Sequence, residues 1–214
     1  MGDGIDTSKS TSPKGENAGG EKLPRTKRGL ATRAKILDAA RVEFGQVGFG
    51  ETSIVAITQR AKVALGTFYT YFDSKEEVFR ALVADMSQRV ADAVAPAIAD
   101  VEDGIDRERA ALEAFLRFAR TQAEVYRIID EAEFVDPEGF EQHYRGTAAR
   151  IGARLDESEE MTPATSDLDS EVRAWAVMGM NVFLGLRFSV WGDEDPAKVA
   201  AAANRLMAEG LRRD

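Results

Sequence analysis

The chain has 214 residues, of which 44% are hydrophobic and 30% charged, so its composition is that of a folded globular protein. It contains no cysteine, which excludes a disulfide framework, a thiolate metal site and a thiol nucleophile. The net charge of −9 is unevenly divided: residues 1–80 hold 13 basic against 10 acidic side chains, and residues 81–214 hold 15 against 27. Residues 22–35 carry six basic side chains and no acid, and a basic arm on an acidic body indicates two separate tasks.

No segment of the sequence is typical of a targeting signal or a membrane span. The first 35 residues lack the apolar core of a signal peptide. The most apolar run, from Trp175 to Trp191, is interrupted by Asn181 and Arg187. We therefore expect a soluble cytoplasmic protein with no membrane partner.

Residues 1–24 are predicted to form a disordered tail, because almost no apolar side chain is present to offset the entropy of ordering. A helix is expected from about Thr32, with Gly48 as a left-handed stop. Thr52 is a candidate cap for a second, short helix over 54–61. The apolar stripe of the first helix comprises Ile36, Leu37, Ala40, Phe44 and Val47.

A third helix is predicted over 65–72, and the segment SKEE then forms a capping box, with Ser74 at the cap and Glu77 three residues later. The fourth helix starts at Lys75 and runs toward Val94, and Pro96 is expected to close it.

Beyond Pro96 the pattern predicts only helices, since no strand-like alternation occurs. The predicted ranges are 106–120, 121–132, 137–155, 170–191 and a last helix from Pro196 to about 211, with an acidic loop at 156–168. The expected fold class is therefore all-α, with about nine helices.

The third helix is predicted to have two different faces. On a helical wheel, Leu65, Phe68 and Phe72 lie together as core positions, whereas Gly66 and Thr70 lie opposite, flanked by Thr67 and Tyr69. Tyr71 is assigned to neither face. A surface of small, hydroxyl and phenol groups suits DNA, because it permits close approach and hydrogen bonds to phosphates and base edges. The link AKVA at 61–64 completes a helix-turn-helix pattern, although a generic three-helix core with an exposed aromatic face has the same spacing.

The segment from Thr32 to Phe79 resembles the DNA-binding region of TetR-type bacterial repressors. The matching features are GF..TS at Gly48 to Ser53, GTFY at Gly66 to Tyr69, Phe72 and SK at Ser74-Lys75. The resemblance implies a helix-turn-helix domain at 25–80 and an effector-binding and dimerisation domain at 81–214. It implies a repressor that binds a palindromic operator as a dimer and is released by a small molecule.

The resemblance also implies a set of DNA contacts. They are Ser53, Gly66, Thr67, Tyr69, Thr70 and Lys75. Arg33 is a further phosphate candidate, and Lys27 and Arg28 either enter a flanking minor groove or belong to a solvated tail.

Three positions in this region depart from the family pattern. Lys62 stands where a turn glycine is usual, which costs about 1 kcal/mol if φ is positive, although its amine can add a phosphate contact. Ala64 replaces a capping serine, and Leu65 stands where a basic residue is common. These departures leave open a helical interaction protein with weakened DNA binding.

In the family, the last two long helices of each subunit form the dimer interface. The corresponding apolar positions here are Trp175, Met178, Val182, Leu186, Val190, Val199, Ala203, Leu206 and Leu211, for which ordinary monomer core is the alternative. Candidate pocket residues are Tyr126, Arg127, Phe134, Phe140, His143, Tyr144, Arg145, Trp175 and Met178. The expected effector is small and apolar, with an acyl-CoA or lipid-like character. The alternative is an aromatic or cationic drug with an efflux operon as the target.

No pattern indicates catalysis or a cofactor. The sequence lacks a Ser/His/Asp arrangement, a phosphate-cradling loop and a metal motif, so we do not expect an enzyme. A metal site from Glu131, Glu133 and His143 is disfavoured, because the chain has one histidine and the spacing fits no known ligand pattern.

Overall fold

The computed structural model describes residues 24–158 and 163–211, and within these ranges every regular element is a helix. The elements are α1 Lys27–Glu51, α2 Ile54–Ala61, α3 Leu65–Tyr71, α4 Lys75–Ile98, α5 Gly104–Thr121, α6 Glu124–Val135, α7 Pro137–Asp156, α8 Asp167–Gly185, the π-helical turn η1 Leu186–Val190 and α9 Pro196–Glu209. The all-α expectation is confirmed. The predicted disordered tail lies, up to residue 23, outside the described residues.

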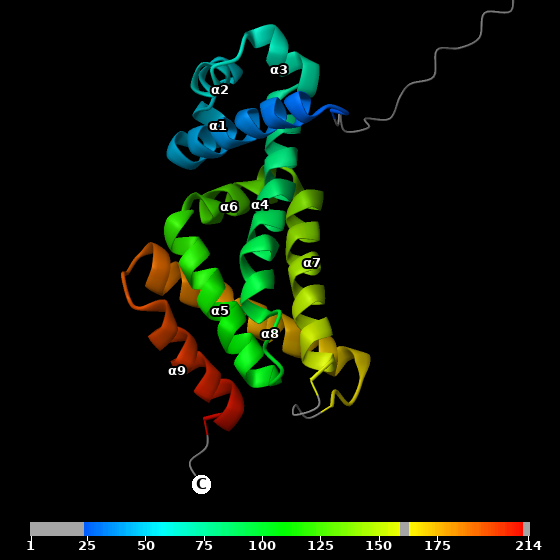
Figure 1. Ribbon diagram of the computed structural model, residues 1–214, viewed down its shortest axis with the longest axis vertical. Coiled ribbons are helices and arrows are strands. Elements are labelled where there is room, and N and C mark those ends of the chain that lie inside the picture. The colour runs from blue at the N-terminus through cyan, green and yellow to red at the C-terminus, as the bar shows by residue number, and fades with distance from the viewer. Residues whose placement is uncertain (1–23, 159–162, 212–214) are drawn as a thin grey trace, which may run out of the picture.

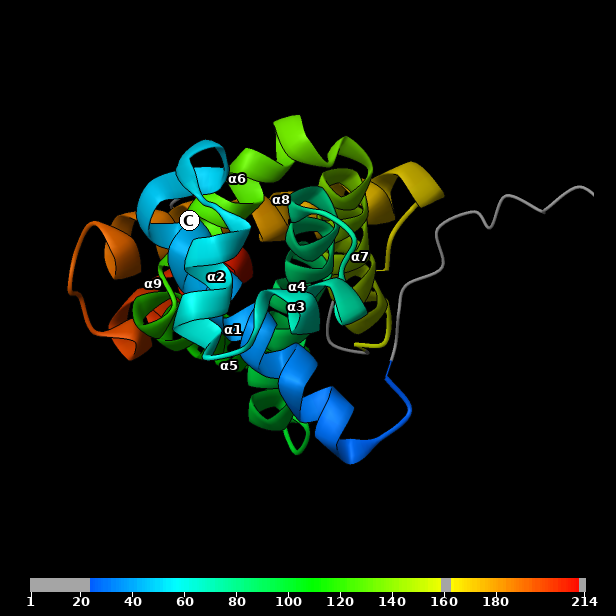
Figure 2. The ribbon, with the colours of Figure 1, turned by 90° about the horizontal axis from the view of Figure 1, so that it is seen from above.

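The helices form an elongated molecule with α1, α2 and α3 gathered at one end (Figure 1). From this end α4 runs into the body, where α5 and α7 pack on it. α6 lies directly beneath α1, and α8 crosses behind the body, with α9 alongside α5. In the view from above, α2 and α3 lie nearest the viewer, and α8 and α9 lie behind them (Figure 2). The helix-turn-helix segment is thus presented at one tip.

One hydrophobic core joins this tip to the body. Phe44 of α1 meets Phe79 of α4 edge-on at 5.1 Å between ring centroids, and Phe49 meets the same ring at 5.1 Å. The core continues into α5 and α6 through Phe118 and Ile128. α1 is therefore packed directly against α4 and α6 of the body.

The structure corrects three of the predicted helix boundaries. Gly48 has a positive φ of 85°, as expected, but it kinks α1 rather than ending it. Ser53 rather than Thr52 caps α2: its Oγ accepts the N–H of Ala56 at 3.1 Å, while Thr52 is buried. α4 continues past Pro96 to Ile98, since a proline in the last turn disrupts few helical bonds.

Lys62 ends α2 in the left-handed region, with φ 55° and ψ 46°. Replacing Lys62 with glycine is expected to stabilise the fold by about 1 kcal/mol, because glycine adopts this conformation without steric cost. Urea denaturation measures the change. Lys62→Ala is the matched control, since it removes the amine but keeps the Cβ atom. An equal gain in both variants would show that charge, and not backbone strain, is the cause.

Candidate nucleic-acid interface and ligand cavity

The two faces predicted for α3 are present except at its first residue. Phe68 and Phe72 are buried, whereas Gly66 and Thr70 are exposed and Tyr69 is 46% exposed. The core position predicted for Leu65 is wrong: this side chain is 46% exposed, since it stands at the first residue of the helix, outside the core cluster. Thr67 is half-buried, and Tyr71 packs against the core. Ala64 makes no side-chain cap bond, as expected from its side chain. The outward surface therefore offers a phenol and hydroxyls close to exposed backbone, which is suitable for contact with phosphates and base edges.

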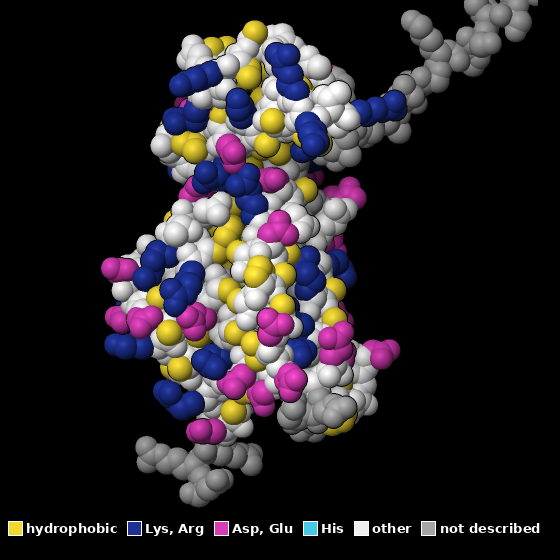
Figure 3. All heavy atoms as spheres, in the orientation of Figure 1, with side chains coloured by type: hydrophobic (Ala, Val, Ile, Leu, Met, Phe, Trp, Pro, Cys, Tyr) yellow, Lys and Arg dark blue, Asp and Glu magenta, His cyan; other side chains and the backbone are white. Residues whose placement is uncertain are grey.

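Basic side chains lie around this surface. Lys27 and Arg28 form the exposed first turn of α1, and Lys62 is exposed at the turn between α2 and α3. The guanidinium of Arg33 lies 5.3 Å from the centroid of Phe72. In the space-filling view, Lys and Arg side chains predominate over the α1–α3 end, and most acidic side chains lie over the body (Figure 3).

Lys75 occupies a different position from the one expected of a phosphate contact. Its Nζ donates to the carbonyl oxygens of Phe49 at 2.7 Å and Thr52 at 3.0 Å. The same amine lies 4.3 Å from the centroid of the Phe49 ring. Lys75 therefore ties the start of α4 to the segment that follows Gly48.

Polar side chains of α6 also bind the backbone on both sides of Gly48. Glu131 Oε2 accepts the N–H of Phe49 at 2.6 Å, and Arg127 Nη1 donates to the carbonyl of Gln46 at 3.0 Å. Arg127 and Glu131 also pair with each other, with 3.3 Å between Nε and Oε1. We call Lys75, Arg127 and Glu131 the junction residues. They link α4 and α6 to the backbone that leads into α2.

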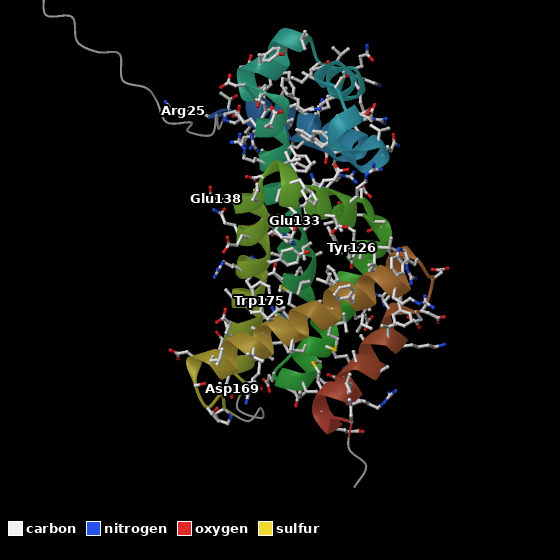
Figure 4. The ribbon with its side chains drawn as sticks, turned by 180° about the vertical axis from the view of Figure 1, so that it is seen from behind. Arg25, Tyr126, Glu133, Glu138, Asp169 and Trp175 are labelled. Carbon is white, nitrogen blue, oxygen red and sulfur yellow. The ribbon has the colours of Figure 1, made fainter. Side chains whose placement is uncertain are left out.

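The body contains a cavity of about 1020 Å³ that lies among α4, α5, α6, α7 and α8 and is open to solvent. This volume is at the upper end of the range of about 300–1,000 Å³ usual for ligand pockets. Of the predicted pocket residues, six line it: Tyr126, Phe140, His143, Tyr144, Trp175 and Met178. Figure 4 shows Tyr126 and Glu133 on α6, and Trp175 on α8.

Three predicted pocket residues lie elsewhere. Arg127 points to α1, Phe134 is 83% exposed, and Arg145 pairs with Glu141 on the outer surface of α7. The second half of α4 was not predicted to line the cavity, but it contributes Val90, Val94 and Ile98. Phe115 of α5 and Arg150 of α7 also line it and were not predicted. The four-residue spacing on α4 was a usable signal, because these side chains continue the buried stripe of that helix.

Buried polar groups in the cavity wall are held by specific partners. Tyr126 Oη donates to the carbonyl of Val182 at 2.9 Å, and burial raises the pKa of this phenol. His143 Nδ1 lies 2.6 Å from Ser87 Oγ. Burial, with a contribution from Arg150, lowers the pKa of His143 to about 4. The cavity therefore contains a neutral imidazole at neutral pH.

This histidine makes stability depend on pH. In the unfolded chain His143 titrates near pH 6.5, so between about pH 6.5 and 4 the unfolded state binds a proton that the folded state does not. Stability is therefore retained above pH 6.5 and lost as the pH falls. The free energy of unfolding is expected to drop by about 2 kcal/mol from pH 6.5 to 5 on this account. Chemical denaturation across this range, compared with His143→Gln, isolates the effect; parallel curves for the two proteins would contradict it.

The side chains of the disfavoured metal site are not gathered in one place. Glu131 binds the N–H of Phe49 and Arg127, whereas His143 faces the cavity from α7. Over residues 24–158 and 163–211, no three His, Asp or Glu side chains are grouped to hold a metal ion. In the same part of the chain, no helix is both long and apolar enough to cross a bilayer.

Exposed apolar side chains form a stripe along α8. They repeat at helical spacing, and two of them, Trp175 and Phe183, also line the edge of the cavity; the members are Leu168, Val172, Trp175 and Phe183. Of the positions expected at a dimer interface, Trp175 and Leu206 are exposed, whereas Met178 and Ala203 are buried in the monomer.

Comparisons with known proteins agree with this architecture. A sequence model of bacterial regulatory proteins of the tetR family matches residues 36–82, which cover most of α1, the helix-turn-helix and the start of α4. The uncharacterized HTH-type transcriptional regulator YdgC of Bacillus subtilis is 28% identical over 191 residues, which span 86% of this chain and 94% of that protein.

Two solved structures have a similar fold. A TetR-like transcriptional regulator from Rhodococcus sp. RHA1 is 27% identical with a TM-score of 0.67, and the match covers 88% of this chain and 98% of that one. The regulator FadR from Bacillus subtilis, solved in complex with stearoyl-CoA, is 16% identical with a TM-score of 0.67, covering 84% of this chain and 99% of that one. At that identity the second match supports the fold alone.

Proposed function

The chain belongs to the TetR family of bacterial transcriptional regulators and is a DNA-binding helix-turn-helix protein, and from this premise we propose that it is a ligand-responsive repressor. It binds a palindromic operator as a homodimer, and a small apolar molecule in the cavity releases it. The observation that carries the proposal is the double role of α4 and α6. Both helices line the cavity, and both hold the segment after Gly48 through the junction residues.

DNA binding is assigned to residues 25–80. The proposed contacts are Ser53, Lys62, Gly66, Thr67, Tyr69 and Thr70, with Arg33, Lys27 and Arg28 as flanking phosphate or minor-groove contacts. We remove Lys75 from this set, because its amine already binds three carbonyl groups at the end of α1. Residues 81–214 bind the effector and the second subunit.

Dimerisation is proposed through α8 and α9. The exposed stripe on α8 contains large apolar side chains that a second copy would cover. A dimer has two α3 helices, and binding to a palindromic site requires that they reach successive major grooves.

The effector is proposed to be apolar and of acyl character. Support comes from the lining of α4 and α8 by Val90, Val94, Ile98 and Met178, and from a fold shared with a regulator solved with stearoyl-CoA. A ligand that prefers another position of α4 and α6 would weaken DNA binding by its differential affinity for the two states.

A selection from random DNA duplexes with the full chain tests this function. We expect enrichment of a palindromic site whose affinity falls steeply with salt, and loss of binding when an acyl ligand is added. Recovery of no preferred sequence would overturn the assignment and favour a helical interaction protein.

Tyr69 provides a sharper test of the interface. Tyr69→Ala is expected to weaken operator binding about tenfold or more without loss of helix content, because the exposed phenol contributes a hydrogen bond to a charged phosphate. Fluorescence anisotropy on the selected site, with circular dichroism, measures both quantities. Tyr69→Phe separates the hydroxyl from the ring. Wild-type affinity in both variants would remove Tyr69 from the contacts.

A further inference from the structure

The face of α7 that lines the cavity has a row of polar side chains. His143, Thr147, Arg150 and Arg154 follow one another at helical spacing, and all four line the cavity. Two of them, Arg150 and Arg154, are cations beside a wall that is otherwise mainly apolar, so their partners decide what charge the cavity presents to a ligand.

Arg154 has its partner within the protein. Its Nε and Nη2 lie 2.6 and 2.9 Å from the two carboxylate oxygens of Glu108, a side chain that is only 2% exposed. This bidentate pair joins α5 to α7 and neutralises the charge of Arg154.

Arg150 has no such partner. Its Nη2 donates to Thr147 Oγ1 at 3.1 Å, and no carboxylate of the described residues forms an ion pair with it. Burial and the neighbouring Arg154 lower the pKa of Arg150, which indicates a charge held beside apolar surface without compensation. The remaining N–H groups of this guanidinium are available to an anion.

We propose that Arg150 anchors the anionic head group of the effector, a carboxylate or a phosphate, while the acyl chain fills the apolar part of the cavity. This inference rests on the proposed function and adds a chemical class and an orientation to it. Arg150 is exposed at the edge of the cavity, so the head group stays close to water while the chain is buried. A planar guanidinium suits both head groups, because it binds carboxylate and phosphate through two parallel hydrogen bonds.

The acidic side chains of the cavity wall lie away from Arg150. Asp130 and Glu133 line the cavity from α6, and Glu141 lines it from the start of α7, nine residues before Arg150. Burial together with Glu133 raises the pKa of Asp130. Burial, with smaller contributions from the same two carboxylates, raises the pKa of Tyr144. An anionic head group beside α6 would meet two like charges, so the orientation with the head at α7 is favoured. A cationic ligand would reverse this orientation, which makes it the competing outcome.

Binding of four amphiphiles with one chain length tests the proposal. The delipidated full-length protein is titrated with laurate, lauroyl-CoA, 1-dodecanol and dodecyltrimethylammonium below their micelle concentrations. Heat is recorded, or tryptophan fluorescence, to which Trp175 in the cavity wall and Trp191 both contribute. Operator release is measured separately for each ligand. We expect the anionic ligands to bind at least tenfold more tightly than the alcohol and the cation. Preference for laurate assigns the anion to a carboxylate, and preference for lauroyl-CoA assigns it to phosphates.

Three variants connect the preference to Arg150. Arg150→Gln should remove at least tenfold of the affinity for the anionic ligand and leave dodecanol unchanged, and Arg150→Lys should restore part of the loss. Arg117→Gln on α5 is the control, because Arg117 and its partner Glu113 both lie outside the cavity.

The outcomes distinguish a failure of the head-group site at Arg150 from a failure of the proposed repressor function. Tightest binding by the cation or the alcohol, or wild-type affinity in Arg150→Gln, overturns the role of Arg150 even if that ligand releases DNA. Arg150-dependent binding without release of DNA upholds the head-group site and overturns the effector function.

Discussion

Replacing Glu108 with glutamine is expected to lower the free energy of unfolding by about 3 kcal/mol. Glu108 is 2% exposed and binds the guanidinium of Arg154 through both oxygens. The substitution preserves shape and removes the charge, so Arg154, whose side chain is 16% exposed, loses its counter-ion in a poorly solvated place. An arginine that stays buried without its carboxylate partner destabilises the fold, because the free energy of its desolvation is no longer offset by the attraction between the two charges.

Chemical denaturation of three proteins checks this expectation. Glu113→Gln on the same helix is the matched control: it breaks a surface pair with Arg117, whose side chain is 62% exposed, and should change stability by less than about 0.5 kcal/mol. The double variant Glu108→Leu with Arg154→Leu should lose far less than the single change, because no charge is left buried. A small effect of Glu108→Gln would show that water or neighbouring groups already solvate Arg154.

Signals within a few residues of each other predicted local structure well. Ser74 caps α4 as expected, because its Oγ accepts the N–H of Glu77 at 3.1 Å, and the Glu77 carboxylate accepts the N–H of Asp73, one residue before the cap. Asp195 caps α9 one residue before Pro196. The division of α3 into buried Phe68 and Phe72 and an exposed Tyr69 was predicted from helical spacing alone. Such features depend on the 3.6-residue repeat and on cap chemistry, both of which are readable in one short window.

Contacts between distant segments were not predictable in this way. Lys75 was expected at phosphate but binds carbonyls 23 to 26 residues earlier, and Arg127 was expected in the cavity but reaches α1. A charged side chain at a half-exposed helix position looks the same in sequence whether it faces water, DNA or another helix. The cavity draws on five helices, so its lining depends on tertiary packing that no single stripe determines.

Replacing Gly48 with alanine is expected to destabilise the fold by about 3 kcal/mol and to weaken operator binding. Gly48 has φ 85° and ψ 170°, a conformation that is available almost only to glycine. An added Cβ would also lie 2.6 Å from Glu131 Oε1 and 2.7 Å from Arg127 Nη2. It would therefore displace the two junction residues of α6, and the hydrogen bond from Phe49 N–H to Glu131 would be lost.

Gly50→Ala is the matched control, because this glycine lies two residues away in the same segment and a Cβ there would meet no atom within 4 Å. Denaturation and operator anisotropy are measured on both variants, at a temperature where each remains folded. Glu131→Gln then separates strain from coupling, since it keeps the backbone conformation and weakens only the contact between α6 and α1. We expect it to reduce the effect of a bound ligand on operator affinity more than it reduces stability. Unchanged release by the ligand in Glu131→Gln would leave α4, held to the same segment through Lys75, as the route between the cavity and DNA.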